Sequence, residues 1–389
     1  MNTGMQAQSM RLTNTSLVLR TILSAPTPIS RTIVADQTGL TSATVSRLVD
    51  TLIDAGLLIE LEPERSSPGR PSLPLQASSR TCVAIGLEVN IDYLALCVMD
   101  ISGDILEQQI VPGNYRQSDP VAIMERLAAL VDAADIPDDA FITGLILNIP
   151  GICTGTTVRV APNLGWHNVD LKPLWNPRRQ LPELRLMNEA DGGGYAVLYD
   201  RPGRMNDDDT FAYISGDVGI GAAMFFNGRL LAGRHGWAGE FGHICVDPAG
   251  PKCACGSNGC LEQYSGFDAI LAAAGLPAGT RPAELIAAFD AGDLDVRAAL
   301  DQASTSLGRG VATIVNLLDV DVIVFGGTMA VLLSRMQKLL TDELEYRVLG
   351  SRWSSLVMRP NTRGPLSASL GACHLSFEEL INSPEVIIK

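Results

Sequence analysis

The segment HICVDPAGPKCACGSNGCLEQ, residues 243–263, concentrates metal-binding side chains in a chain whose composition is otherwise that of an ordinary globular protein. One imidazole and three thiolates form a soft ligand set that suits tetrahedral Zn²⁺. Two cysteines separated by one residue cannot easily close a disulfide with each other. No open coordination position or adjacent general base is evident, so a bound zinc would be structural; the alternative is a group of merely buried cysteines. The expected ligands are His243, Cys253, Cys255 and Cys260.

The whole chain sets limits on the class of protein. At 389 residues it is too long for one hydrophobic core, so two or three domains are expected. Its apolar runs, such as residues 93–99 and 320–327, have the length of strands and fall far below the roughly 20 residues that a membrane helix needs. The N-terminus lacks a basic segment followed by an apolar run. We therefore expect a cytoplasmic protein with no membrane contact and no disulfides.

Charge is distributed unevenly along the chain. The net charge of −14 argues against nucleic-acid binding by the whole surface. Residues 1–80 carry seven arginines and six acidic residues, a net charge of +1, which leaves −15 for residues 81–389. This asymmetry indicates two parts with separate roles.

Residues 1–62 have the pattern of a helix-turn-helix domain. Helices are predicted over residues 14–24, 30–37 and 42–55, with Gly39 supplying the turn before the third. An apolar stripe at the spacing i, i+3, i+4, i+7 would bury the third helix against the other two. This stripe consists of Val45, Leu48, Val49 and Leu52. The opposite face carries Ser42, Thr44 and Arg47, which we expect to contact the major groove and the phosphates of DNA.

Residues 63–80 are predicted to form a wing tip and a linker. A short apolar strand follows Gly56, and a polar loop and a second possible strand come next. The loop carries Gly69 and Arg70 between prolines, an extended and slim tip that could enter a minor groove. We therefore predict a DNA-binding winged helix; the alternative is a three-helix interaction module with a Pro-rich linker. The expected DNA contacts are Ser42, Thr44, Arg47, Gly69 and Arg70.

Residues 81–389 alternate strands and helices in two similar units. The first has three strands, a helix over residues 121–135 and a buried strand over residues 142–151. The second starts with a glycine-rich hairpin at residues 211–233. Later helices and a last strand follow at residues 282–290, 298–319 and 320–328. We expect a duplicated mixed α/β architecture that binds ligands in the cleft between two lobes.

The spaced cluster is similar to the zinc and sugar signature of the ROK family, which groups bacterial sugar kinases with sugar-responsive repressors. The matching residues are Glu240-Phe-Gly-His243 and Cys253-x-Cys255-Gly256-x-x-Gly259-Cys260-Leu261-Glu262. The resemblance covers about residues 81–389 and implies an actin-like, hexokinase-type fold of two lobes. The first lobe would comprise residues 81–187 and 370–389. The second lobe, with the zinc motif and the sugar cleft, would comprise residues 188–369.

The same resemblance implies a sugar pocket. Carboxylates and amides supply the acceptors and donors that a ring of hydroxyls needs at fixed angles. His243 would bind zinc through one nitrogen and offer the other to the sugar. Each carboxylate taken alone could equally be a solvated surface acid. The positions that match the family's sugar contacts are Asn163, Asn188, Glu189, Glu240, His243 and Glu262.

Two departures from the family's kinases bear on activity. The kinases open with Asp-x-Gly-x-Thr, whose glycine lets the backbone cradle phosphate, whereas residues 85–92 have neither that glycine nor that threonine. Glu189 stands where the kinases have the aspartate that acts as general base, and a displacement of about 1 Å can cost on the order of a hundredfold in rate. We therefore expect no enzyme activity; the alternative is an active ATP-dependent ROK sugar kinase with an attached DNA-binding segment.

The winged helix and the altered phosphate loop together predict a transcriptional regulator, most often a repressor in this family. A sugar in the cleft would favour one arrangement of the lobes and lower the affinity for DNA. We expect a homodimer on a palindromic operator, because one winged helix contacts few base pairs. Some family members respond instead to a component of a transport system. The strands of residues 86–100 resemble those of regulators associated with xylose and similar sugars.

Overall fold

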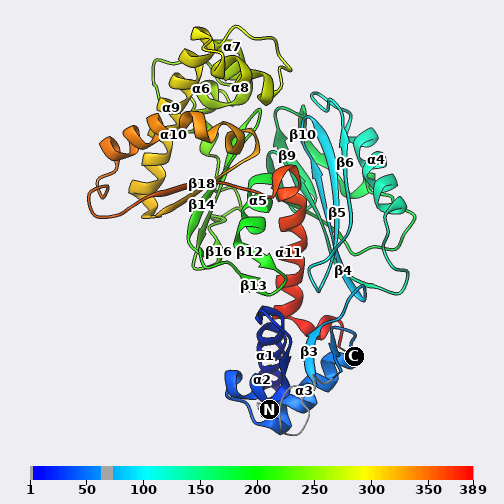
Figure 1. Ribbon diagram of the computed structural model, residues 1–389. Helices are drawn as coiled ribbons and strands as arrows, with labels where there is room; N and C mark the ends of the chain where they lie inside the picture. Colours follow the sequence, from blue (N-terminus) through cyan, green and yellow to red (C-terminus); the bar gives the residue numbers. More distant parts are fainter. Residues whose placement is uncertain (1–2, 63–72, 389) are drawn as a thin grey trace.

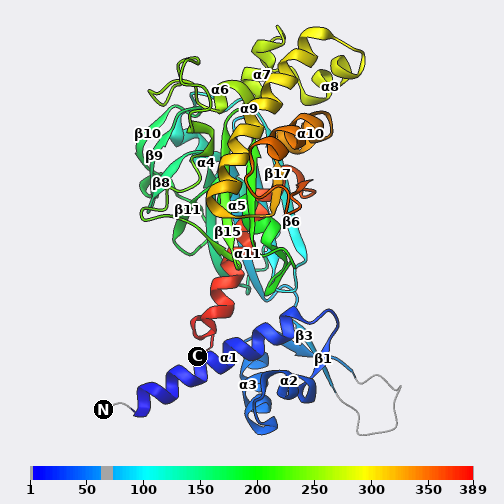
Figure 2. The ribbon, with the colours of Figure 1, turned by 90° about the vertical axis from the view of Figure 1, so that its left-hand side faces the viewer.

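A computed structural model describes residues 3–62 and 73–388 of the chain. A small N-terminal domain lies at one end of a two-lobed body, and the last helix of the chain runs between the lobes toward that domain (Figure 1). Figure 2, turned by 90°, shows the same domain set apart below the body. The predicted fold class, an N-terminal winged helix followed by a two-lobed α/β body, is confirmed.

The N-terminal domain combines three helices with a three-stranded antiparallel sheet of order β1-β3-β2. Thr41 caps the third helix by accepting a hydrogen bond from Thr44 N at 3.3 Å. Gly39 has a φ of 69°, which the turn before that helix requires. The predicted apolar stripe is buried. The elements are α1 (Thr3–Ser24), β1 (Ile29–Ser30), α2 (Arg31–Thr38), α3 (Ser42–Asp54), β2 (Leu58–Glu60) and β3 (Pro74–Ala77).

Two details of this domain qualify the sequence-based boundaries. Helix α1 begins at Thr3 rather than near residue 14. The sequence before residue 14 has no apolar stripe, so it did not predict a helix there. Strand β3 lies within residues 63–80 and pairs with both β1 and β2, so part of that segment belongs to the sheet of the wing. Gly69 and Arg70, at the predicted wing tip, lie outside the described residues.

Each lobe is built on a five-stranded mixed sheet with the same order of strands. The order is β6-β5-β4-β7-β11 in the first lobe and β16-β15-β14-β17-β18 in the second. In both sheets the first two pairs of neighbouring strands are antiparallel and the last two pairs are parallel, which is the predicted duplication. The strands are β4 (Cys82–Val89), β5 (Tyr93–Asp100), β6 (Ile105–Pro112), β7 (Phe141–Ile149), β11 (Leu184–Asn188), β14 (Phe211–Gly216), β15 (Ile220–Phe226), β16 (Arg229–Leu230), β17 (Val322–Gly326) and β18 (Val357–Pro360).

Helices and short hairpins complete the body. In the first lobe these are α4 (Pro120–Ala133), β8 (Ile152–Thr154), β9 (Thr157–Ala161), β10 (Trp166–Asp170) and η1 (Lys172–Leu174). The second lobe has β12 (Tyr199–Arg201), β13 (Arg204–Met205), η2 (Phe241–His243), α6 (Glu262–Ser265), α7 (Phe267–Ala273), α8 (Pro282–Asp290), α9 (Leu294–Leu318), α10 (Gly327–Arg347) and η3 (Gly364–Leu366), and η4 (Pro384–Val386) ends the chain. Among the described residues, no helix is both long enough and apolar enough to cross a bilayer.

Helices α5 (Glu189–Leu198) and α11 (Ser367–Asn382) pack against each other between the two sheets (Figure 1). Their close approach depends on glycine. A Cβ on Gly371 of α11 would lie 1.8 Å from Gly192 O of α5, and a Cβ on Gly86 of β4 would lie 1.8 Å from Ser369 O. Any side chain at these positions would push α11 away from its neighbours, so these glycines fix the helix pair at the centre of the body.

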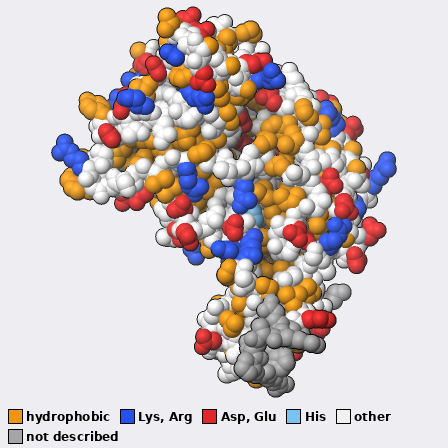
Figure 3. All heavy atoms as spheres, viewed as in Figure 1, with side chains coloured by type: hydrophobic (Ala, Val, Ile, Leu, Met, Phe, Trp, Pro, Cys, Tyr) orange, Lys and Arg blue, Asp and Glu red, His pale blue; other side chains and the backbone are white. Residues whose placement is uncertain are grey.

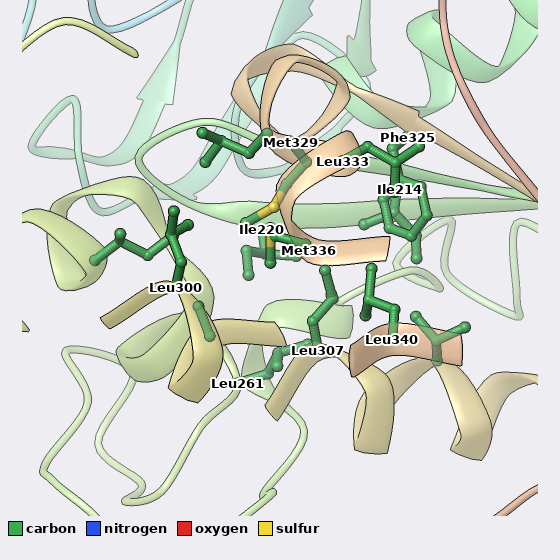
Figure 4. Close-up of a cluster of buried hydrophobic side chains, with 14 of the residues drawn as sticks. Ile214, Ile220, Leu261, Leu300, Leu307, Phe325, Met329, Leu333, Met336 and Leu340 are labelled. Atoms are coloured by element: carbon green, nitrogen blue, oxygen red, sulfur yellow. The ribbon is translucent and has the colours of Figure 1, made fainter. Parts of the chain in front are cut away.

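The second lobe has its own apolar core, where α9 and α10 cover one face of the sheet (Figure 4). Leu307 of α9 and Met336 and Leu340 of α10 point toward Ile214 and Phe325 of the sheet. This core anchors the start of α10 and the end of β14, and these two segments border a cavity of the body.

The N-terminal domain is joined to the body by a shared core. Leu19 and Leu23 of α1 belong to the same buried cluster as Phe377 and Ile381 of α11. The Arg20 guanidinium pairs with the Glu378 carboxylate of α11 at 2.6 Å and 3.0 Å. A bidentate ion pair beside an apolar contact holds α1 to α11 in one orientation.

Candidate metal centre and sugar pocket

Four side chains from one region of the second lobe meet at a point. The ligand atoms of His243, Cys253, Cys255 and Cys260 all lie within 4.8 Å of one another. His243 Nδ1 is 3.7 Å from Cys253 Sγ, and Cys255 Sγ is 3.7 Å from Cys260 Sγ. Such separations suit four ligands held about 2.0–2.3 Å from one Zn²⁺. The predicted ligands are thus brought together, and one nitrogen with three sulfurs fits zinc.

Backbone contacts shape the loop that carries these cysteines. Cys245 and Cys260 form an isolated antiparallel bridge, although the exposed Cys245 thiol is outside the cluster. Gly259 has a φ of 66°, and a Cβ there would lie 1.6 Å from Asp247 O. Only glycine permits this approach, so the return of the loop toward His243 depends on the glycine before Cys260.

His243 presents its two ring nitrogens to different partners. Nδ1 faces Cys253 Sγ, whereas Nε2 lies 3.9 Å from Glu240 Oε2. A metal bound at Nδ1 would fix the tautomer and leave Nε2–H as a donor beside Glu240. The ring can therefore join a metal centre to a pocket for hydroxyl groups.

Glu262 and Asn163 approach each other beside Gly219. A Cβ on Gly219 would lie 2.9 Å from Glu262 Oε2 and 3.5 Å from Asn163 Nδ2. Glu262 Oε2 also accepts a hydrogen bond from Ile220 N at 3.2 Å. Asn163 follows β9 of the first lobe and Glu262 begins α6 of the second. Both lobes therefore contribute to one polar wall.

Asn188 and Glu189 stand at the start of α5. Asn188 Oδ1 caps the helix by accepting a hydrogen bond from Ala190 N at 2.8 Å, and Asn188 Nδ2 donates to Gly151 O at 3.1 Å. Glu189 Oε1 accepts a hydrogen bond from Ser215 Oγ. Asn188 thus keeps one N–H and one lone pair for a ligand, and it also positions the helix that carries Glu189.

Burial shifts the titration of the acids in this region. It raises the pKa of the Glu189 carboxyl to about 7. It also raises the pKa of Asp191 to about 7, with a further contribution from the charge of Glu189. Burial raises the pKa values of Glu240 and Glu262, while His243 lowers both. A carboxyl group with a pKa near neutrality can donate as well as accept hydrogen bonds to hydroxyls.

Sequence reasoning missed Glu88 and Asp191. Glu88 of β4 is 2% exposed, its Oε1 accepts a hydrogen bond from Tyr93 OH at 2.9 Å, and its Oε2 has no hydrogen-bond partner among the described residues. Burial raises the pKa of Glu88 to about 8. A carboxylate inside an otherwise apolar strand was the signal for Glu88. Asp191, two residues after Glu189, gave no signal beyond its position.

A cavity of about 260 Å³ adjoins Glu88 and Glu189. Figure 3 shows the body hollowed between its lobes. Glu88, Glu189 and Asp217 contribute three carboxyl groups to the lining, with Tyr93 and Thr328, and none of the described lining residues is basic. The phosphates of a nucleoside triphosphate would be repelled there by the charge of Asp217.

The predicted DNA-contacting face of α3 is open to solvent in part. Ser42 and Arg47 are exposed, whereas Thr44 is half-buried and its Oγ1 lies 2.9 Å from Thr41 Oγ1. Arg31 is tied to Asp50 and Glu60 at 2.7 Å and 2.8 Å. Arg47 therefore remains a basic side chain on this face that is available to phosphate.

Comparison with known proteins identifies the family. The sequence model of the ROK family matches residues 84–379, most of the chain. The chain belongs to the ROK family. The IclR helix-turn-helix domain matches residues 12–60 of this ROK protein, in agreement with the fold of its N-terminal domain.

Relatives of this ROK protein include named repressors. The xylose repressor of Bacillus subtilis (strain 168) is 26% identical over 376 residues, which cover 95% of this chain and 96% of the relative. The putative xylose repressor of Caldicellulosiruptor sp. (strain Rt8B.4) is 30% identical over 334 residues, 80% of this chain and 82% of the relative.

Solved structures agree on the fold. A ROK family transcriptional regulator described as a homolog of the E. coli MLC protein matches with a TM-score of 0.79 at 23% identity, covering 97% of this chain and 99% of its own. A ROK family glucokinase from Streptomyces griseus, solved with glucose and AMPPNP, matches with a TM-score of 0.64 at 24% identity. It covers 75% of this chain and 98% of its own. The regulator thus spans the N-terminal domain as well as the body.

Proposed function

We propose that this ROK protein is a sugar-responsive DNA-binding transcriptional regulator, a repressor that a monosaccharide or sugar derivative releases from its operator. The observation that supports this best is the presence in one chain of a winged helix and a polar pocket beside His243. The relatives named xylose repressor and putative xylose repressor support the same class of function. A regulator of this kind would work in the cytoplasm.

The pocket proposed for the sugar consists of hydrogen-bonding groups from both lobes. A structural zinc held by His243, Cys253, Cys255 and Cys260 would fix the imidazole, so that Nε2–H and the Glu240 carboxylate address neighbouring hydroxyls. Asn163 and Glu262 would bind further hydroxyls across the cleft. Because these groups lie on different lobes, a sugar would favour a closed arrangement of the lobes.

Kinase activity is not proposed. The cavity beside β4 is lined by carboxyl groups rather than basic ones, and Glu189 places its carboxyl one methylene farther from the backbone than an aspartate would. The direct check is an ATP-dependent phosphorylation assay. Turnover at ordinary kinase rates, about 1–100 s⁻¹, would overturn the proposal in favour of a sugar kinase.

Helix α11 gives the proposed signal a route to DNA. Its first turn borders the cavity through Ser367 and Ala368, and its last turns hold α1 through Glu378 and the shared core. A change in lobe arrangement that moves α11 would move the winged helix with it. Two copies related by a twofold axis would place two α3 helices on a palindromic operator.

Titration calorimetry with D-xylose, D-glucose and N-acetyl-D-glucosamine tests the proposal, together with release of the protein from its own upstream DNA. We expect one of these sugars, or a phosphorylated form, to bind and to weaken DNA binding by about 5- to 150-fold. No heat with any sugar would instead point to a protein signal from a transport component. Light scattering of the same samples tests the homodimer.

Neutralising Glu240 should weaken sugar binding. A hydrogen bond from a sugar hydroxyl to a charged carboxylate contributes about 1.5–3 kcal/mol, so Glu240→Gln should lower sugar affinity by about 10- to 100-fold. Calorimetry measures this change. Glu345→Gln, at an exposed position on α10, serves as the control and should bind like the wild type. Equal sugar affinity in both variants would show that Glu240 does not bind the sugar.

Replacing Arg47 should weaken DNA binding at all sequences alike. Arg47→Ala removes an exposed charge from α3. We expect weaker binding and a salt dependence whose slope falls by about one, because one phosphate contact is lost. Fluorescence anisotropy at several salt concentrations measures both. Arg352→Ala, an exposed arginine of the second lobe, should change neither; equal behaviour of the two variants would contradict the assignment of α3.

A further inference from the structure

The carboxylate of Asp217 lies at the N-terminal end of α10. Its Oδ1 accepts hydrogen bonds from Thr328 N at 2.8 Å and from Thr328 Oγ1 at 3.0 Å. Helix α10 is 21 residues long, and its N-cap, Gly326, has no side chain to satisfy the first amides. The N-terminus of a helix attracts anions because its free N–H groups and its dipole favour negative charge. Asp217 supplies that anion from within the chain.

The backbone is shaped to receive this carboxylate. Gly327 has a φ of 58°, and a Cβ there would lie 2.6 Å from Asp217 Oδ1. Even an alanine at this position would have to displace the carboxylate. The Gly326-Gly327-Thr328 turn thus has the form of an anion site, and the side chain of Asp217 occupies it.

The other carboxylate oxygen reaches the opposite lobe. Asp217 Oδ2 is 3.5 Å from Asn90 Nδ2, and Asn90 is 7% exposed at the turn between β4 and β5. Asn90 Oδ1 in turn accepts a hydrogen bond from Asp92 N at 3.2 Å. This turn is the segment that the family resemblance equates with the phosphate loop of the kinases. One carboxylate therefore connects the start of α10 in the second lobe with the β4–β5 turn in the first.

The charge around the start of α10 disfavours binding of a second anion. Asp217, Glu88 and Glu189 line the same cavity of about 260 Å³. A phosphate group placed there would find the helix N-terminus already occupied by the Asp217 carboxylate and would be repelled by its charge. A neutral ligand carries no such penalty.

We propose that Asp217 is a resident anion that takes the place of phosphate at the start of α10, excludes phosphate groups from that helix end and holds the β4–β5 turn against the second lobe. Asp217 is in this sense a specificity-determining and positioning residue. The loop it anchors continues through Gly219 to Ile220, whose amide holds Glu262, so its position also bears on the polar wall described above.

Hydrogen exchange of the full chain without sugar tests the positioning role, independently of the proposed function. In Asp217→Ala we expect exchange at the first amides of α10 and in the β4–β5 turn to rise by about 10- to 100-fold, as the loss of a charged hydrogen bond predicts. Asp217→Asn, which keeps an acceptor for Thr328, should show a smaller rise at α10. Asp268→Ala removes a carboxylate that pairs with Arg116 across the lobes at 2.9 Å and should leave α10 unchanged. Exchange in Asp217→Ala that equals the wild type at both segments would overturn the positioning role.

Inorganic phosphate tests the exclusion. Added phosphate should slow exchange at the start of α10 in Asp217→Ala, where the site is open, and should have no effect on the wild type. Equal protection of both proteins would show that Asp217 does not fill the site. Protection of neither would show that the start of α10 is not a phosphate site, and exclusion would then be wrong. If Asp217→Ala unfolds, the same comparison applies to Asp217→Asn, where the missing charge should permit the phosphate effect.

Discussion

Cys255→Ser is expected to weaken zinc binding by more than about 100-fold, since even residues that only support a ligand are worth about 10- to 100-fold in metal affinity. Cys255 is exposed, so the substitution removes a ligand without opening a buried core. His243 would then lose its fixed position, and the affinity for sugar should fall as well. Metal analysis of the purified protein and competition with a chelator measure the first effect, and calorimetry measures the second.

Cys245 supplies a matched control for this experiment. It is also an exposed cysteine of the same segment, but it is outside the four-residue cluster. Cys245→Ser should keep one zinc per chain and wild-type affinity. Wild-type protein that holds no zinc when prepared without chelators, or Cys255→Ser that binds zinc as tightly as Cys245→Ser, would contradict the proposed metal centre.

Glu88→Gln is expected to raise stability at high pH. The pKa of Glu88 is about 8 in the folded chain, against an ordinary value of 4.5. Between these pH values the folded carboxyl keeps its proton while the unfolded one loses it, so the folded state binds more protons and stability falls as pH rises. Glutamine resembles the protonated acid and removes this fall. The gain above about pH 8 should be on the order of 5 kcal/mol and should become small near pH 5.

Urea unfolding at several pH values measures this difference directly. Glu125→Gln, at an exposed position on α4 of the same lobe, is the control and should give the pH dependence of the wild type. The Glu88 hydrogen bond from Tyr93 can persist in the variant, because the glutamine carbonyl also accepts. A Glu88→Gln profile parallel to that of the wild type between pH 5 and pH 8.5 would show that Glu88 is ionised in the folded chain.

Local spacing in the sequence was enough to predict that His243 and three cysteines cluster, and to predict the winged helix. The cysteines at 253, 255 and 260 lie on one loop, so their separation along the chain already limits their separation in space. The stripe on α3 repeats every three to four residues, and its burial follows from that period. The duplication of the α/β unit was also predicted from the repeated strand pattern, but the order of the strands within each sheet was not.

Features that depend on distant contacts could not be predicted. Arg20 meets Glu378 at the far end of the chain, and no local pattern reports such a pair. The raised pKa values of Glu88 and Asp191 come from burial by segments that are remote in sequence. Asn188 was expected to contact sugar, but its role as the cap of α5 became visible only when Ala190 N and Gly151 O were placed beside it. The role of Asp217 likewise could not be predicted, because its partner Thr328 at the start of α10 is remote in sequence.

The central position of α11 couples the completion of the body to the placement of the N-terminal domain. This helix fills the space between the two sheets and also contacts α1. Without it, the faces of β4 and α5 that receive Ser369 and Gly371 would be uncovered. A truncated chain that lacks α11 should therefore neither complete its body nor hold the N-terminal domain in its final orientation.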